Sequence, residues 1–113
     1  MSVLGIDQIT YSTDDLPTSR RFFQDWGLTL ASESADELAF ESLNGCRVVV
    51  AATGKDGLPP AIEDGSTLRE VVWGVESEAD LARYADAIRS DAGFVDTVVD
   101  GMRRIGCTDP NGL

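Results

Sequence analysis

The sequence predicts an α+β domain in which one strand–helix–strands unit occurs twice. Alternating, strand-like residues at Gly5–Thr13 and again at Leu68–Glu76 are each followed by an acidic cluster and a helix-like segment. The Asn44-Gly45 pair, which precedes an apolar run, has a counterpart in Asn111-Gly112, after which only Leu113 follows. The expected order is therefore βαβββ followed by βαββ, with the final strand of the second unit missing.

The first unit, about residues 1–54, is expected to open with a strand at Val3–Thr13, in which Gln8 and Thr10 share one face. The acidic and proline-containing run Asp14–Pro17 favours a helix start, and Gly27 favours the helix end. Three short strands should follow, with Asn44-Gly45 as a hairpin turn, at about Leu28–Glu33, Glu37–Leu43 and Cys46–Thr53.

The second unit, about residues 68–113, follows a Gly- and Pro-rich linker at about residues 55–67. After the strand at Leu68–Glu76, Ser77 with Asp80 resembles a capping box at the start of a helix. Two further strands and a turn are expected at Phe94–Asp100, Met102–Thr108 and Asp109–Gly112.

Composition excludes several classes of function. The 9 basic and 20 acidic residues give a net charge of −11, which repels nucleic-acid phosphates and anionic membrane surfaces. No apolar run approaches the roughly 20 residues of a membrane-spanning helix, and no signal peptide is visible, so a cytoplasmic location is expected. The chain has no histidine, which excludes histidine-based catalysis and histidine-ligated metal sites within it.

The layout resembles the vicinal oxygen chelate superfamily, which contains glyoxalase I, bleomycin-resistance proteins and extradiol dioxygenases. The likeness spans almost the whole chain and is loose at each motif. It lies in the order of Gly5–Ile9, Asp14–Leu16 with Phe22-Phe23 and Trp26–Leu28, Glu70–Val75, and the turn Thr108–Leu113. The resemblance implies two paired βαβββ modules whose mixed sheet curves around a cleft, with the helices on the outer face.

In that family, the metal ligands come from the first and last strands of each module. By resemblance, the first-strand positions are Gln8 and Glu70, and the last-strand position of the first module is Val49, which cannot ligate. Two oxygen ligands are too few for a dedicated catalytic site, so the resemblance implies no metal in this chain. The likeness is greatest to the metal-free N-terminal domain of two-domain extradiol dioxygenases, whose Fe(II) or other divalent metal would lie in a further domain.

We therefore expect a small-molecule site at Gln8, Thr10, Arg47 and Glu70, with no catalytic residue assigned. Alternation places Arg47 on the cleft side, where a guanidinium could receive a carboxylate or phenolate oxygen. The competing reading is that Arg47 pairs with Glu70 or lies at a solvated strand end. Tyr11 and Trp73 are expected to pack under the helices as core.

Two other functions stay open at this point. One is a binding protein of the bleomycin-resistance kind, for which the acidic character of the chain suits cationic ligands. The other is a metalloenzyme that a partner chain completes, since an unpaired strand edge invites a homodimer.

Overall fold

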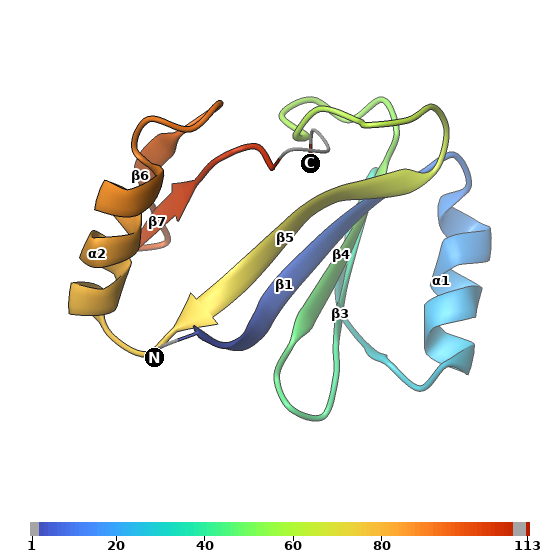
Figure 1. Cartoon of the computed structure of the whole chain (residues 1–113). Coiled ribbons are helices and arrows are strands. Elements are labelled where there is room, and N and C mark those ends of the chain that lie inside the picture. The colour runs from blue at the N-terminus through green and yellow to red at the C-terminus, as the bar shows by residue number, and fades with distance from the viewer. Residues whose placement is uncertain (1–2, 110–112) are drawn as a thin grey trace. The chain divides into compact units, whose positions relative to one another are not determined.

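The computed structural model describes residues 3–109 and 113, which form two compact units. Ile6–Trp73 make up one unit, and Gly74–Leu113 with the first residues of the chain make up the other. The elements, shown in Figure 1, are β1 (Val3–Thr13), α1 (Leu16–Asp25), β2 (Thr29–Glu33), β3 (Glu37–Glu41), β4 (Arg47–Ala52), β5 (Thr67–Val75), α2 (Glu78–Ile88), β6 (Val95–Val99) and β7 (Met102–Gly106).

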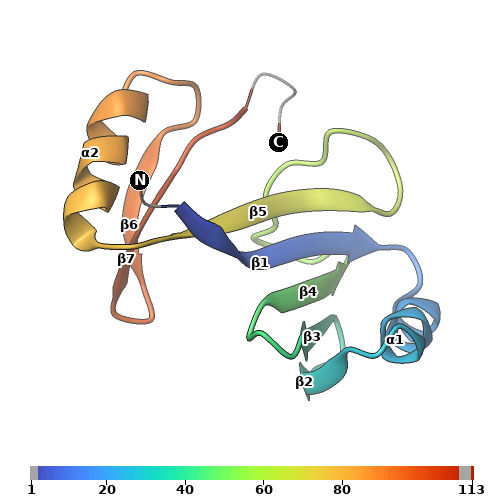
Figure 2. The same ribbon diagram turned by 60° about the horizontal axis from the view of Figure 1, so that its bottom comes forward.

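The predicted α+β class is confirmed by a five-stranded mixed sheet, a separate two-stranded sheet and two helices. The larger sheet has the order β2-β3-β4-β1-β5. β1 runs parallel to β4, while β3 is antiparallel to both β2 and β4. The connection from β1 to the remaining strands passes through α1, which lies along one side of this sheet in Figure 2.

The apolar core of the Ile6–Trp73 unit lies between α1 and the side of the sheet that α1 covers. Phe40 is 0% exposed and, with Leu38 and Val50, forms the centre of the core. Phe23 from α1 packs with its ring centroid 5.4 Å from that of Phe40 and 6.1 Å from that of Tyr11. The partly buried side chains around this centre are Leu16, Leu28, Leu30 and Val48, together with Phe23.

Local sequence signals set both ends of α1, as predicted. The Asp15 carboxylate accepts hydrogen bonds from the Thr18 backbone N–H at 3.1 Å and from the Thr18 hydroxyl at 2.8 Å. These bonds satisfy a helix-start donor and lower the pKa of Asp15. At the other end Gly27 has φ +98°, and the Leu28 N–H donates to the Phe23 carbonyl at 3.1 Å, which completes a Schellman motif.

Tight turns close the β3–β4 hairpin and the β6–β7 hairpin. Gly45 has φ +83°, a conformation that glycine adopts without a Cβ penalty, and the Asn44-Gly45 pair joins β3 to β4 as predicted. In the second unit, Asp100 and Gly101 both have positive φ and connect β6 to β7. This is the backbone geometry of a two-residue hairpin loop that matches strand twist.

The helix of the second unit begins at the predicted cap. The Ser77 hydroxyl accepts from the Asp80 N–H at 3.2 Å and donates to the Asp80 carboxylate at 3.1 Å. Aspartate is shorter than the usual glutamate, and its carboxylate meets the Ser77 hydroxyl. Neither helix in the described residues is long and apolar enough to cross a bilayer.

One expectation about the core is wrong, and one predicted turn lies mostly outside the described residues. Trp73 is 58% exposed, so it is not the core residue that the alternation predicted; Tyr11, by contrast, packs against Phe23. The predicted turn at Asp109–Gly112 falls largely outside the described residues. The described part shows that the Asp109 N–H donates to the Leu113 carbonyl at 3.0 Å.

Replacing Phe40 by alanine should lower the free energy of unfolding by about 3–5 kcal/mol, because it removes the ring at the centre of the core. Chemical denaturation followed by circular dichroism measures the loss. Phe22→Ala is the matched control, since Phe22 is 53% exposed and should lose clearly less. Equal losses for the two variants would contradict this assignment of the core.

The Asp15 cap should make stability fall in acid. Because the folded-state pKa lies below the ordinary 3.8, the ionised cap stabilises the fold above about pH 4, and this contribution is lost as the pH falls through the folded pKa. Asp15→Asn keeps a capping oxygen without the charge, so its stability should depend less on pH in this window. Exposed Asp56→Asn should follow the wild-type curve, and thermal melts between pH 2 and pH 6 compare the three.

Candidate functional site: the polar face of the first sheet

Strand pairing places polar side chains together on the side of the sheet opposite α1. In register, Gln8 pairs with Arg47 and Thr10 pairs with Val49. Side chains of paired residues project to the same side of a sheet, and every second residue follows them. We call this side the polar face; on β1, β3 and β4 it comprises Gln8, Thr10, Ser12, Glu37, Ala39, Glu41, Arg47, Val49 and Ala51.

On β5, the structure places Arg69 on this face in place of the predicted Glu70. The Arg69 Nε donates to the Ser12 hydroxyl at 2.9 Å, and the same hydroxyl donates to the Thr67 carbonyl at 3.3 Å. Alternation from Arg69 puts Glu70 on the opposite side of the strand. The expectation that Glu70 shares a face with Gln8 is therefore corrected. A phase difference of one residue moves every side chain of a strand to the other side.

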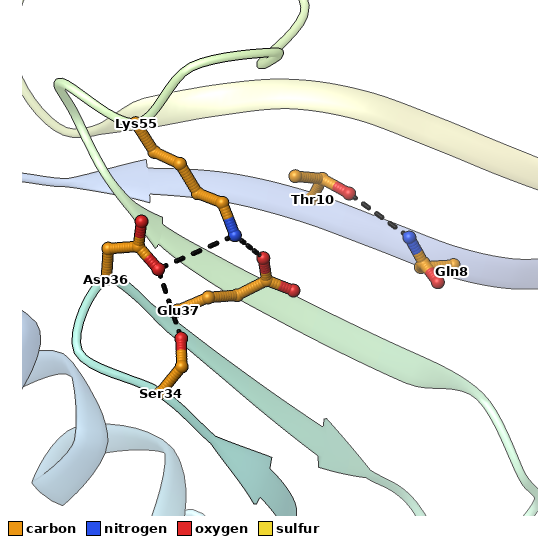
Figure 3. Close-up of polar contacts among 6 residues, drawn as sticks. All are labelled: Gln8, Thr10, Ser34, Asp36, Glu37 and Lys55. Atoms are coloured by element: carbon orange, nitrogen blue, oxygen red, sulfur yellow. Dashed lines mark hydrogen bonds and ion pairs between the residues drawn. The ribbon is translucent and has the colours of Figure 1, made fainter.

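The other three predicted residues do share the polar face. The half-buried Gln8 amide donates to the Thr10 hydroxyl at 3.3 Å, a contact drawn in Figure 3. Thr10 is 6% exposed, whereas Arg47 is exposed at the start of β4. Their shared face is confirmed, and their role in ligand binding stays a prediction.

The two arginines of the polar face form no ion pair among the described residues. Arg69 is 8% exposed and binds only neutral acceptors, the Ser12 hydroxyl and the Pro59 carbonyl, the latter at 2.8 Å. The predicted pairing of Arg47 with Glu70 is not observed. Guanidinium groups with unused donors are suited to receive carboxylate or phenolate oxygens.

The segment between β4 and β5, residues 53–66, contacts the polar face at two points. We call it the connector; it has no helix or strand. Lys55 forms an ion pair and hydrogen bond with Glu37 and lies 3.7 Å from the Asp36 carboxylate, as Figure 3 shows. The hydrogen bond to Glu37 is the main cause that raises the pKa of Lys55. The Pro59 carbonyl makes the second contact, to Arg69.

Among residues 3–109 and 113, no three His, Cys, Asp or Glu side chains are grouped for metal binding. Val49, at the position where the family resemblance expects a ligand, lies beside Thr10 in the register. What this arrangement offers a ligand is a row of hydrogen-bonding groups flanked by cations.

A separate hollow lies on the other side of the sheet, beside α1. Its volume is about 290 Å³, and aromatic side chains and hydroxyl groups line it, among them Tyr11, Phe22, Phe23, Thr13 and Ser19. The Thr13 and Ser19 hydroxyls bind one another at 2.8 Å. The hydroxyls that line this hollow are thus already engaged in part, and none of the four candidate residues is among its lining.

Sequence reasoning missed Arg69. The signal available was the strand pattern of Thr67–Val75, which gives the strand but not the side to which Arg69 projects.

No protein-family model matches the chain, and no curated protein matches it. The functional conclusion therefore rests on the chain's own residues.

Ser12 should matter chiefly because it holds Arg69. Ser12→Ala removes the acceptor of a buried guanidinium and should lower the free energy of unfolding by about 1–3 kcal/mol. In an Arg69→Met background the same change should have much less effect, because no buried donor loses its partner. A double-mutant cycle by chemical denaturation measures the coupling, and additive losses would contradict the contact.

Proposed function

We propose that this chain is a metal-free module of the vicinal oxygen chelate type that binds a small molecule on its polar face. The observation that carries the proposal is the common face of Gln8, Thr10, Arg47 and Arg69, opposite the helix-covered core. Binding sites usually combine an apolar floor with a few convergent polar groups. Ala39, Val49 and Ala51 would supply that floor; all three are buried in this structure, so a ligand would have to displace what covers them.

The strand order supports the family assignment. A βαβββ module places its first strand beside its fourth, and β1 lies beside β4 in the order β2-β3-β4-β1. β5, which would be the first strand of the second module, lies next to β1. In this proposal β5 and the β6–β7 hairpin belong to a second module, although β6 and β7 form a sheet of their own.

The proposed role is scaffold and ligand contact without catalysis by this chain. Arg47 and Arg69 lie on the same face as Glu37 and Glu41, and cations in that position disfavour a divalent metal ion there. If the likeness to the N-terminal domain of extradiol dioxygenases holds, Fe(II) chemistry would belong to a further domain. A homodimer or such a domain would then complete the cleft.

A binding protein of the bleomycin-resistance kind is the second candidate, and it needs no chemistry either. The polar face modifies this candidate, because Arg47 and Arg69 oppose the cationic ligands that the net charge suggested. Ligands that carry a carboxylate or phenolate suit this face better.

The purified chain should contain far less than one equivalent of iron, manganese, nickel or zinc after mild desalting, and added metal should not raise its Tm. Elemental analysis and thermal melts provide the two measurements. Stoichiometric metal on a dimer that light scattering detects would instead favour a metalloenzyme completed by a partner chain.

Arg47→Gln should weaken the binding of phenolate and carboxylate compounds several-fold, since it removes a charged donor from the polar face. Thermal shift or amide NMR titration measures the affinity. Arg21→Gln is the matched control, because Arg21 is an exposed arginine on α1 with no ion pair among the described residues. Equal affinities for the two variants would place the ligand elsewhere.

A further inference from the structure

Arg69 is a buried cation that pairs with no carboxylate among the described residues. It is 8% exposed, and its described hydrogen bonds go to the Ser12 hydroxyl at 2.9 Å and to the Pro59 carbonyl at 2.8 Å. A guanidinium has more N–H donors than these two acceptors use. Burial of a charge is unfavourable unless an opposite charge compensates it, so this position is one where an anion would be stabilised.

One acidic residue on the polar face and one in the connector bind other groups. Glu37 on the polar face pairs with Lys55. Glu63 in the connector accepts from the Thr67 hydroxyl at 3.2 Å. In a chain with 20 acidic residues, a buried arginine that none of the described carboxylates pairs with is an exception that a ligand would explain.

The connector supplies a neutral acceptor where a carboxylate would bind more strongly. A carboxylate carries the opposite charge and can bind a guanidinium through two parallel hydrogen bonds, so it competes well with the single, uncharged Pro59 carbonyl. Loops longer than about 12–15 residues without regular structure are uncommon and are usually either lids and binding segments or linkers. The connector has this character, with positive φ at Gly57 and Gly65.

We propose that Arg69 anchors a carboxylate subsite on the polar face, and that a bound carboxylate takes the place of the Pro59 carbonyl and releases the connector. This inference rests on the proposed function, because it names the ligand class of the same face. The Ser12 hydroxyl holds the guanidinium in place, and the ligand body lies over Ala51, Val49 and Ala39, which are buried in this structure and become accessible only when the connector moves.

A single carboxylate fits better than a phosphate. One guanidinium balances one negative charge, and the next cation along the face, Lys55, already pairs with Glu37 and Asp36. A doubly charged phosphate would leave uncompensated charge in a chain whose net charge is −11. Small alanine and valine side chains favour a compact apolar body such as a single ring.

Benzoate is a suitable probe, and benzamide is its uncharged analogue. At constant ionic strength, benzoate should raise the Tm of the wild-type chain with increasing concentration, while benzamide and inorganic phosphate should not. Arg69→Gln should lower the benzoate affinity roughly tenfold or more. Arg21→Gln, the exposed arginine control, should bind as the wild type does.

A second measurement keeps the test decisive if Arg69→Gln fails to fold. In the wild type, benzoate should shift the amide NMR signals of Ser12, Leu58 and Arg69 and speed hydrogen exchange in the connector. Shifts confined to other regions, or slower exchange in the connector, would overturn the proposal. So would equal binding of benzamide.

Different results would contradict the carboxylate subsite and the proposed function. If uncharged ring compounds bind the polar face and their affinity survives Arg69→Gln, the proposed function stands and the carboxylate subsite falls. If no small molecule perturbs Gln8, Thr10 or Arg47 and metal is bound stoichiometrically, the proposed function itself falls.

Discussion

The parallel pairing of β1 with β4 beneath α1 is the constraint on which the site depends. Because side chains alternate along a strand, the apolar residues that bury Phe40 and Val50 against α1 force their neighbours to the other side. Gln8 and Thr10 on β1 and Arg47 on β4 then share one face without any contact among themselves having to specify it. The hydrophobic core thus determines, through strand register, which polar groups a ligand meets.

The bond from Arg69 to Ser12 shows which residues of β5 face the site, and these residues determine its charge. Had Glu70 faced the same side as Gln8, the face would offer carboxylate and amide oxygens, the ligands that hard divalent cations prefer. Arg69 in its place offers N–H donors and positive charge. A face with this donor set suits anionic or hydrogen-bond-accepting groups.

The elements could be predicted from sequence where their causes are local. The helix start at Asp14–Pro17, the Gly27 helix end and the Asn44-Gly45 turn each depend on a few neighbouring residues, and the structure confirms each of them. The side of the sheet that each β5 residue faces depends on contacts with residues far away in the chain, such as Ser12. The internal repeat predicts where the strands lie but not the side to which each residue projects. Trp73 was misassigned to the core for the same reason, and its exposure follows from the same phase.

Net charge and local charge act at different distances in this protein. The net charge of −11 repels an approaching anion, but salt screens that repulsion beyond roughly 10 Å at moderate ionic strength. Within hydrogen-bond distance, the buried guanidinium of Arg69 and the Ser12 hydroxyl beside it decide the interaction. A ligand of the proposed carboxylate subsite would therefore be selected by fit and hydrogen bonding at the sheet and not by long-range attraction. Highly charged polyanions are excluded by the same field that one carboxylate can overcome.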